Sequence, residues 1–564
     1  MRWTRVVTIV PLWIALSIQQ PKDPLDSFCR IFGHQTAVVD RRLYVDGGFV
    51  NHGSLPQDPK NYTNTALLDA DLDVTNLGMP ILRSNLSKPD KVPDVNGAIL
   101  WSDPVNKVLY LYGGEYSDGE PDPFSLWAYD IVPSKWKSMP AGSEDRDIQR
   151  ASYGAGAVVE GGEFAYYYGG WLSNASVPSW GSRPPLALSS LLMYNMDLHT
   201  WTNSSGPDSI GRAEGAMVYL PASDRGMLVY FGGLQVADGM GKTTPQPMDE
   251  ILIYDIANSK WYTQKATGQV PEDRRRFCAG ATWASDYSSY NIYLYGGSEI
   301  SEGVGFDDVY ILSLPSFKWI KWYPTEPGPG YPHHSLSCSV VDGAQMIIIG
   351  GVFTNTTMCD VPNVYAMHNM DLGKQNPDSA PWYQFRPNLT TYKVPPEIVS
   401  AIGGSESGKA NVTSPKGGFG DRDLNTYFQR VYTPPPRTPT HTPEDDDSTP
   451  VGAIAGGTVG GVAGLCIIAG GLYLWLRRRR KQEETTVEET VPTPSAPETK
   501  PPTMYELPAE REQPIGELAN TAPVEMESPG VTKHFSLPGD NHHHYQHPSP
   551  HSRDPSSPSA ELPV

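Results

Sequence analysis

Positive charge, cysteine and local catalytic motifs are all scarce in this 564-residue chain. Lysine and arginine number 43 against 63 acidic residues, so the formal net charge is −20 at pH 7. This charge argues against a nucleic-acid partner, because such partners bind basic surfaces. The chain also lacks a G-x-S-x-G nucleophile elbow, an H-E-x-x-H zinc helix and a phosphate-binding P-loop. No enzyme class therefore follows from a short motif.

A repeated glycine pair is the most informative feature that is present. Six times between residues 33 and 351 an apolar, aromatic-rich run ends in Gly-Gly, and four of the following apolar runs reach a tryptophan seven positions after their first residue. A repeating unit of roughly 50 to 65 residues built from short strands is typical of a β-propeller. The residues concerned are Gly47-Gly48, Gly113-Gly114, Gly169-Gly170, Gly232-Gly233, Gly296-Gly297 and Gly350-Gly351, with Trp136, Trp201, Trp261 and Trp319.

This pattern resembles the kelch repeat of the galactose oxidase/kelch superfamily, which implies an all-β propeller with four-stranded blades. In one unit, residues 150–159, 163–170 and 191–201 are predicted to be the first three strands. The glycines are expected where backbone crowding or a positive φ excludes a side chain, and the tryptophans between neighbouring blades. Six blades with a closing segment are predicted. A seventh pair, Gly403-Gly404, leaves seven blades as the alternative.

Two apolar segments outside the repeats predict the topology. Residues 1–17 have two arginines, an apolar stretch and small residues near their end, as in a secretory signal peptide. Residues 451–476 contain no charge and are long enough for a transmembrane helix, and the following RRRRK places the C-terminus in the cytoplasm. We therefore expect a single-pass membrane protein of the plasma membrane or secretory pathway, with residues 18–431 as an extracellular or luminal propeller.

The segments around the predicted span also have biased compositions. Residues 432–450 are rich in proline and threonine and are predicted to be a stalk, whereas residues 477–564 are predicted to be a disordered cytoplasmic tail. Glycines spaced by four residues within the span suggest a homodimer, although glycine is also a general feature of such helices. These glycines are Gly452, Gly456, Gly460 and Gly464.

Modification sites agree with an exterior location for the propeller. Four of the five cysteines precede the predicted span, and we expect two disulfides, Cys338–Cys359 for its short loop and Cys29–Cys278 by elimination, with free thiols as the alternative. All seven Asn-x-Ser/Thr acceptors of N-linked sugar also precede the span. They are Asn61, Asn85, Asn174, Asn203, Asn355, Asn388 and Asn411.

The order of these segments resembles that of the kelch-repeat single-pass membrane proteins of filamentous fungi. The resemblance implies a cell-surface binding module for a protein or a cell-wall glycan, with no cofactor and no metal. Arg150, Arg212 and Arg276 precede the first strand of three successive blades, so an anion-binding ring at the channel mouth is one hypothesis, and hydrogen bonding to loop carbonyls is the other. An extracellular oxidoreductase or lyase with its site at the channel mouth is the alternative function.

Overall fold

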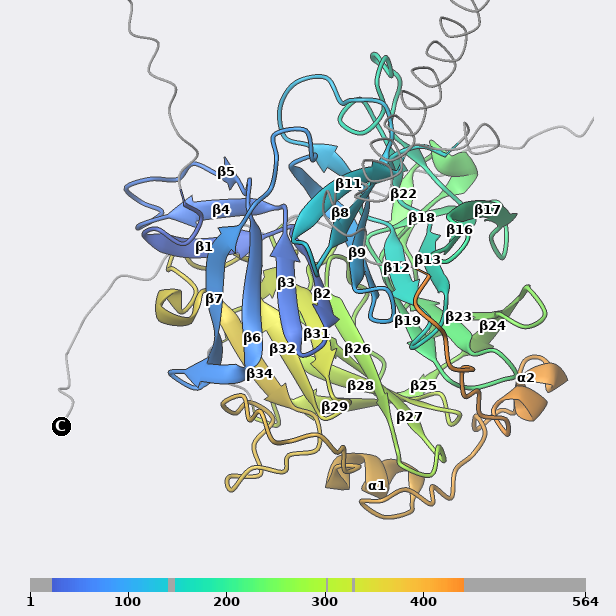
Figure 1. Ribbon diagram of the computed structural model, residues 1–564. Coiled ribbons are helices and arrows are strands. Elements are labelled where there is room, and N and C mark those ends of the chain that lie inside the picture. The colour runs from blue at the N-terminus through green and yellow to red at the C-terminus, as the bar shows by residue number, and fades with distance from the viewer. Residues whose placement is uncertain (1–22, 140–147, 301–302, 327–329, 441–564) are drawn as a thin grey trace, which may run out of the picture. The chain divides into compact units, whose positions relative to one another are not determined.

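The computed structural model describes residues 23–139, 148–300, 303–326 and 330–440, which form a wheel of antiparallel sheets (Figure 1). The chain divides after Ser448 into two compact units, and all described residues belong to the first. Six sheets, each built from one continuous stretch of the chain, are the blades. Blade 1 comprises β2 (Gln35–Val39), β3 (Arg42–Asp46), β6 (Leu67–Asn76) and β7 (Met79–Leu86), and blade 2 comprises β8 (Val95–Asp103), β9 (Val108–Tyr116), β10 (Leu126–Asp130) and β11 (Lys135–Met139).

The remaining blades repeat this arrangement, with a reduced sheet at the end. Blade 3 comprises β12 (Ala155–Val158), β13 (Phe164–Tyr168), β16 (Ser190–Asn195) and β17 (Thr200–Ser205), and blade 4 comprises β19 (Ala216–Leu220), β20 (Met227–Phe231), β23 (Glu250–Asp255) and β24 (Lys260–Lys265). Blade 5 comprises β26 (Cys278–Trp283), β27 (Tyr290–Tyr295), β28 (Val309–Leu314) and β29 (Lys318–Tyr323), with β25 (Thr267–Gly268) added in parallel. Blade 6 comprises β31 (Ser337–Val341), β32 (Gln345–Ile349) and β34 (Met367–Asp371), extended by a bridge from Met370 to Trp382.

The first strands of the blades form a closed circle. Each of β2, β8, β12, β19, β26 and β31 contacts the next, and β31 contacts β2. The predicted all-β propeller is thereby confirmed, with six blades in the described residues. The seven-bladed alternative does not hold, because Gly403-Gly404 follow the helix α1 (Pro396–Ile402) and not a strand.

The glycine pairs link each blade to the next. In each pair the N–H of the second glycine donates to a carbonyl at or just before the start of the following blade. The first of these bonds runs from Gly48 to Val95, and the last runs from Gly351 to Ile31 at 2.8 Å. All twelve glycines have a positive φ. A Cβ on Gly350 would lie 1.9 Å from the oxygen of Ile31. Both expected reasons for glycine, crowding and backbone conformation, therefore apply.

The spacing of seven residues before each tryptophan has a simple origin in strand pairing. Tyr194 in β16 lies directly opposite Trp201 in β17, and their ring centroids are 4.7 Å apart. Trp201 also reaches Tyr112 of blade 2, at 5.3 Å. Trp319 is buried against Phe231 of blade 4 in the same manner. The predicted packing of these tryptophans between blades is confirmed.

Four small sheets lie beside the ends of the blades that carry the glycine pairs. We call this side the glycine-pair face. The sheets are β1 (Phe28–Phe32) with β4 (Phe49–His52) and β5 (Tyr62–Thr63), β14 (Trp171–Leu172) with β15 (Leu186–Ala187), β18 (Gly211–Ala213) with β21 (Leu234–Val236) and β22 (Thr243–Pro245), and β30 (His333–His334) with β33 (Val352–Phe353). Two short 3-10 turns, η1 (Ala237–Gly239) and η2 (Pro362–Val364), accompany them.

After the last blade the chain runs back along the propeller as a strap, residues 396–440, coloured yellow to orange in Figure 1. Helix α1 contacts β29 of blade 5. Helix α2 (Arg422–Tyr427) contributes Leu424 to the core shared by blades 4 and 5. Arg437 then pairs with Asp103 of blade 2 and Asp197 of blade 3. Residues 432–440, predicted to begin a stalk, are therefore part of the propeller.

The four cysteines form two disulfides, but the predicted pairing was wrong. Cys29 of β1 is bonded to Cys359, and Cys278 of β26 is bonded to Cys338 of β31. β26 and β31 are neighbours around the axis, and β1 lies beside the loops of blade 6 because the circle brings both ends of the propeller together. Proximity in sequence was therefore a poor guide to pairing.

The predicted membrane topology also requires correction. Within the part of the chain that the structure describes, no helix is long and apolar enough to cross a membrane; α1 and α2 have seven and six residues. The single-pass assignment and the localisation that depended on it are therefore not retained. The predicted signal peptide 1–17, span 451–476 with its four glycines, and tail 477–564 lie outside the described residues.

Candidate functional site

A ring of backbone hydrogen bonds closes the central channel at the glycine-pair face. One residue at or just before the start of the first strand of each blade has a positive φ, and its N–H donates to the carbonyl of the equivalent residue in the preceding blade at 2.7 to 2.9 Å. Because the six bonds form a closed cycle, little space remains on the axis. The members of this axial ring are Gly33, Gly97, Tyr153, Glu214, Arg276 and Ser335.

Three side chains of the axial ring form one cluster. Arg276 donates from Nε to Glu214 Oε2 at 2.8 Å and lies over the ring of Tyr153 at 4.4 Å. Arg275 donates to the same oxygen at 3.0 Å. Burial alone would raise the pKa of Glu214, but the two guanidinium groups outweigh burial and hold that pKa below its usual range. The cluster is thus an ion-paired group at the mouth in which two arginines share one carboxylate.

The three arginines singled out in the sequence occupy different positions. Arg276 is an axial-ring member and is partly exposed, whereas Arg212 lies two residues before the ring and is 1% exposed. Arg212 donates to both oxygens of Asp208 and to Gln246. Arg150 lies three residues before the ring, is buried, and donates to the carbonyl of Asp122. Arg150 and Arg212 are therefore used within the fold, and Arg276 alone of the three reaches the mouth.

At the opposite face the channel opens into a hollow of about 730 Å³. Its wall consists mainly of the far ends of the first strands, including Val158, Tyr219, Trp283 and Val340. Tyr392, from the chain after the last blade, also lines it. The channel is consequently a funnel that is open on one side and closed by the axial ring on the other.

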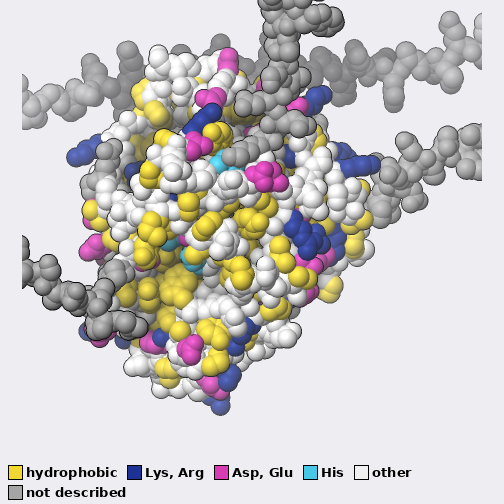
Figure 2. All heavy atoms as spheres, turned by 90° about the vertical axis from the view of Figure 1, so that its left-hand side faces the viewer, with side chains coloured by type: hydrophobic (Ala, Val, Ile, Leu, Met, Phe, Trp, Pro, Cys, Tyr) yellow, Lys and Arg dark blue, Asp and Glu magenta, His cyan; other side chains and the backbone are white. Residues whose placement is uncertain are grey.

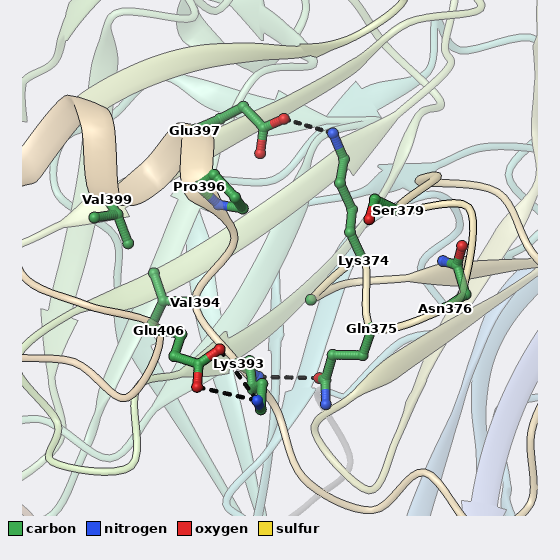
Figure 3. Close-up of a pocket in the computed structure, with 11 residues that line it drawn as sticks. Lys374, Gln375, Asn376, Ser379, Lys393, Val394, Pro396, Glu397, Val399 and Glu406 are labelled. Atoms are coloured by element: carbon green, nitrogen blue, oxygen red, sulfur yellow. Dashed lines mark hydrogen bonds and ion pairs between the residues drawn. The ribbon is translucent and has the colours of Figure 1, made fainter.

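A second hollow, of about 660 Å³, lies beside α1 and is drawn in Figure 3. Its charged side chains point at one another: Lys374 pairs with Glu397 at 2.5 Å and Lys393 with Glu406 at 3.0 Å. Gln375 Oε1 accepts from the backbone N–H of Lys393 at 3.1 Å. The charged side chains of its described lining are thus already paired with one another, and the Lys374–Glu397 pair joins the strap to the chain that follows β34.

The third hollow, which we call the aromatic pocket, lies between blades 5 and 6 on the glycine-pair face and has a volume of about 400 Å³. Tyr295 and Trp382 meet edge to face with centroids 4.9 Å apart, and so do His333 and Phe353 at 4.8 Å. Tyr331, which is 52% exposed, also lines the hollow. Figure 2 views the side carrying β1 and β4 and shows a hollow among hydrophobic side chains with histidine beside it.

The polar groups of the aromatic pocket are mostly oriented by the fold. Tyr295 donates its hydroxyl to Asp307 at 2.7 Å, and His368 Nε2 lies 2.8 Å from Asp360 Oδ1. His333 Nδ1 lies 2.5 Å from the carbonyl of Tyr331, so this nitrogen carries the proton, because a carbonyl only accepts. Burial lowers the pKa of His333, which keeps the ring neutral and leaves Nε2 as an acceptor.

Two buried atoms in this pocket have no hydrogen-bond partner among the described residues. They are His333 Nε2 and Asp360 Oδ2, and both residues are 3% exposed. A buried acceptor without a partner costs roughly 1 to 3 kcal/mol. Neither the channel mouth nor the hollow beside α1 has two such unpartnered acceptors among its described lining residues. The aromatic pocket is therefore the best candidate site.

The comparisons identify the family. The family described as "KLHDC2/KLHL20/DRC7 Kelch-repeats domain" matches residues 33–287. A relative from Arthroderma benhamiae (strain ATCC MYA-4681 / CBS 112371), described as "Kelch repeat-containing protein", is 30% identical over 521 residues, covering 82% of this chain and 76% of the relative. The chain belongs to the kelch-repeat family. The solved structure described as "Structure of YjhT" is 14% identical with a TM-score of 0.42, covering 62% of this chain and 97% of that one.

The aromatic pocket of this kelch propeller was not found from sequence. The repeat pattern assigns no role to His333, and the axial ring shows how it differs from its neighbour His334: His333 precedes the ring by two residues and lines the pocket. His334 instead bonds to Ser335 Oγ at 2.9 Å, which is a structural role. An alignment on the glycine pairs would have exposed this difference of register.

Other predicted residues of the kelch propeller are placed as follows. The side chains of all seven asparagine acceptors for N-linked sugar lie within the described residues, and their modification stays a prediction. Within the described residues no three histidine, cysteine, aspartate or glutamate side chains gather in a metal-binding arrangement.

Proposed function

We propose that this chain is a protein-binding module that receives its partner on the glycine-pair face, at the aromatic pocket. Kelch-repeat propellers are generally protein-interaction modules. The observation that carries the proposal is the pair of buried acceptors, His333 Nε2 and Asp360 Oδ2, in a preformed aromatic hollow. Pockets with apolar walls and a few convergent polar groups are typical of ligand sites.

The aromatic pocket is preorganised by the N-terminal strand. Arg30 of β1 donates to the carbonyls of Thr356 and Met358, both at 2.8 Å. The disulfide Cys29–Cys359 and the N–H of Asp360, which donates to the Cys29 carbonyl at 2.9 Å, hold the same loop. A wall fixed before binding reduces the entropy cost of association. The two disulfides also favour a partner met in an oxidising compartment.

A peptide selection tests this function. Random peptides displayed on phage would be selected on the immobilised full chain, and the selected peptides titrated against Tyr331→Ala and Tyr287→Ala. Tyr331 lies at the aromatic pocket and Tyr287 lines the channel at the opposite face, so the two variants remove the same side chain from different sites. We expect binding to fall at least tenfold in Tyr331→Ala and to be unchanged in Tyr287→Ala.

If peptide affinity instead fell in Tyr287→Ala and stayed unchanged in Tyr331→Ala, the proposed binding face would be refuted.

A cell-wall glycan, the other ligand suggested by the sequence, is tested by co-sedimentation of the full chain with insoluble chitin and β-glucan. If the chain selects no peptide but sediments with either polymer, and Tyr331→Ala abolishes the sedimentation, the partner is a glycan and protein binding is refuted.

A further inference from the structure

The unpartnered atoms of the aromatic pocket determine what a ligand must bring. His333 Nε2 and Asp360 Oδ2 are both hydrogen-bond acceptors without a donor in the part of the chain that the structure describes. The hydroxyl of Tyr295 cannot serve them, because it already donates to Asp307. Asp307 also accepts from the backbone N–H of Tyr331 at 2.6 Å. A ligand that pairs these two atoms must therefore bring a hydrogen-bond donor to them. A ligand that placed an acceptor beside them would leave both atoms unpaired.

The charges around the pocket favour a cationic donor. Asp307 and Asp360 contribute two carboxylates, and His333 is neutral. Arg30 interacts with Asp360 electrostatically, but its nitrogens donate to loop carbonyls, and Asp360 Oδ2 stays without a hydrogen bond. Aromatic faces also attract a cation, by roughly 0.5 to 2 kcal/mol. The guanidinium of Arg30 already lies over the Phe353 ring at 4.8 Å, so a ligand cation would gain from the carboxylates and from the rings of Tyr295 and Trp382.

The shape and polarity of the pocket exclude a ligand that is polar on all sides. Its walls include four aromatic residues, Tyr295, Tyr323, Phe353 and Trp382, and its described lining has two unpaired buried polar atoms. A sugar ring would bring several hydroxyl groups, and most would lose water without gaining a partner. A side chain with an apolar stem and one charged end matches the walls and the base.

Resting on the proposed function, we infer that the aromatic pocket binds a lysine or arginine side chain of the protein partner. The stem lies between the aromatic rings, and the charged nitrogen donates to Asp360 Oδ2 and His333 Nε2. Buried charged or aromatic anchors of this kind dominate the energy of many interfaces. The pocket is then the part of the binding face that selects a basic residue.

The test uses small probes that separate charge from shape. N-acetyl-lysine methylamide, N-acetyl-arginine methylamide and N-acetyl-norleucine methylamide would each be titrated into the full chain by calorimetry, with glucosamine as a fourth probe. Norleucine keeps an apolar stem and lacks the amine. We expect the lysine or arginine probe to bind at least tenfold more tightly than the norleucine probe and more tightly than glucosamine.

Two variants locate the binding. Asp360→Asn should lower the affinity for the basic probe at least tenfold. Asp224→Asn removes the same charge from an exposed ion pair with Arg430 and should leave that affinity unchanged. Thermal unfolding checks that each variant is folded. If Asp360→Asn does not fold, Tyr331→Lys is used in its place. It puts a competing cation at the exposed edge of the pocket and should also lower the affinity for the basic probe tenfold.

Three results would overturn the inference: equal affinity for norleucine, tighter binding of glucosamine, or a folded Asp360→Asn chain that binds the basic probe like the wild type. Each would leave the peptide selection intact. If the chain selects peptides whose binding depends on Tyr331 but binds the lysine and norleucine probes equally, protein binding at the pocket is supported and the lysine or arginine anchor is refuted.

Discussion

The amide nitrogen of Gly33 lies 2.8 Å from the carbonyl oxygen of Ser335, and this hydrogen bond joins the first blade to the last. A second closing bond runs from Gly351 to Ile31 at the same distance. Each blade is built from one continuous stretch of the chain, so the closure of the circle depends on these bonds, on the contact of β2 with β31 and on the Cys29–Cys359 disulfide. Stability should therefore be most sensitive to changes at this junction.

The first prediction concerns glycine at the junction. Gly350→Ala places a Cβ 1.9 Å from the oxygen of Ile31, so the backbone must shift and the closing bond is lost. Gly53 has the same φ of +64°, but a Cβ on Gly53 would meet no atom within 4 Å, which makes Gly53→Ala a matched control. We expect Gly53→Ala to cost about 1 kcal/mol of backbone strain and Gly350→Ala at least about 3 kcal/mol more, measured by denaturant unfolding. Equal losses would show that crowding does not matter there.

The second prediction concerns the strap. Arg437 is largely buried and pairs with Asp103, whose side chain is fully buried, and with Asp197. Arg437→Ala leaves these carboxylates without their partner, so we expect a loss of about 3 to 5 kcal/mol in the free energy of unfolding. Arg430→Ala, in the same strap, breaks an exposed pair with Asp224 and should cost less than about 1 kcal/mol. If residues 432–440 were a free stalk, the two variants would be indistinguishable.

The third prediction concerns the disulfides. Peptide mapping without reduction should recover Cys29–Cys359 and Cys278–Cys338, and recovery of Cys338–Cys359 would contradict the structure. The first bond closes a separation of 330 residues and the second one of 60. Because loop entropy grows with the logarithm of length, the Cys29→Ser, Cys359→Ser variant should lose about 1 to 2 kcal/mol more than the Cys278→Ser, Cys338→Ser variant. Chemical denaturation measures the difference.

The fourth prediction concerns pH. Burial, with a smaller contribution from Arg276, lowers the pKa of His334 to about 4 from its ordinary 6.5. Between these values the unfolded chain binds a proton that the folded chain does not, so the free energy of unfolding falls as pH falls, by at most about 1.4 kcal/mol per pH unit. His34 acts in the same direction, since burial lowers its pKa to about 3.

His334→Asn isolates this effect, because asparagine can still bond to Ser335 and does not titrate. The free energy of unfolding, measured with urea at pH values from 8 to 4, should fall less steeply with decreasing pH for the variant than for the wild type. Above pH 7 the difference between the two proteins should be constant. Parallel curves across the whole range would show that His334 is not protonated on unfolding.

The repeat pattern determined the architecture on its own. The glycine pairs and the spacing of seven before Trp201 and Trp261 report strand pairing and crowding inside each blade, and such constraints act over a few residues. The number of blades and the packing of the tryptophans between blades were therefore predictable. The choice between an anion-binding ring and hydrogen bonding within the fold for Arg150 and Arg212 was not, because a shift of two or three residues relative to the axial ring separates a buried arginine from one at the mouth.

What the tertiary structure alone decided depends on contacts between distant parts of the chain. The disulfide partners, the strap that brings Arg437 to Asp103, and the aromatic pocket that brings Tyr295 to Trp382 all join residues separated by tens to hundreds of positions. Closing the circle sets these distances, and no local pattern encodes them. The sequence by itself therefore determined the repeated unit, and the closed ring decided which side chains meet at the site.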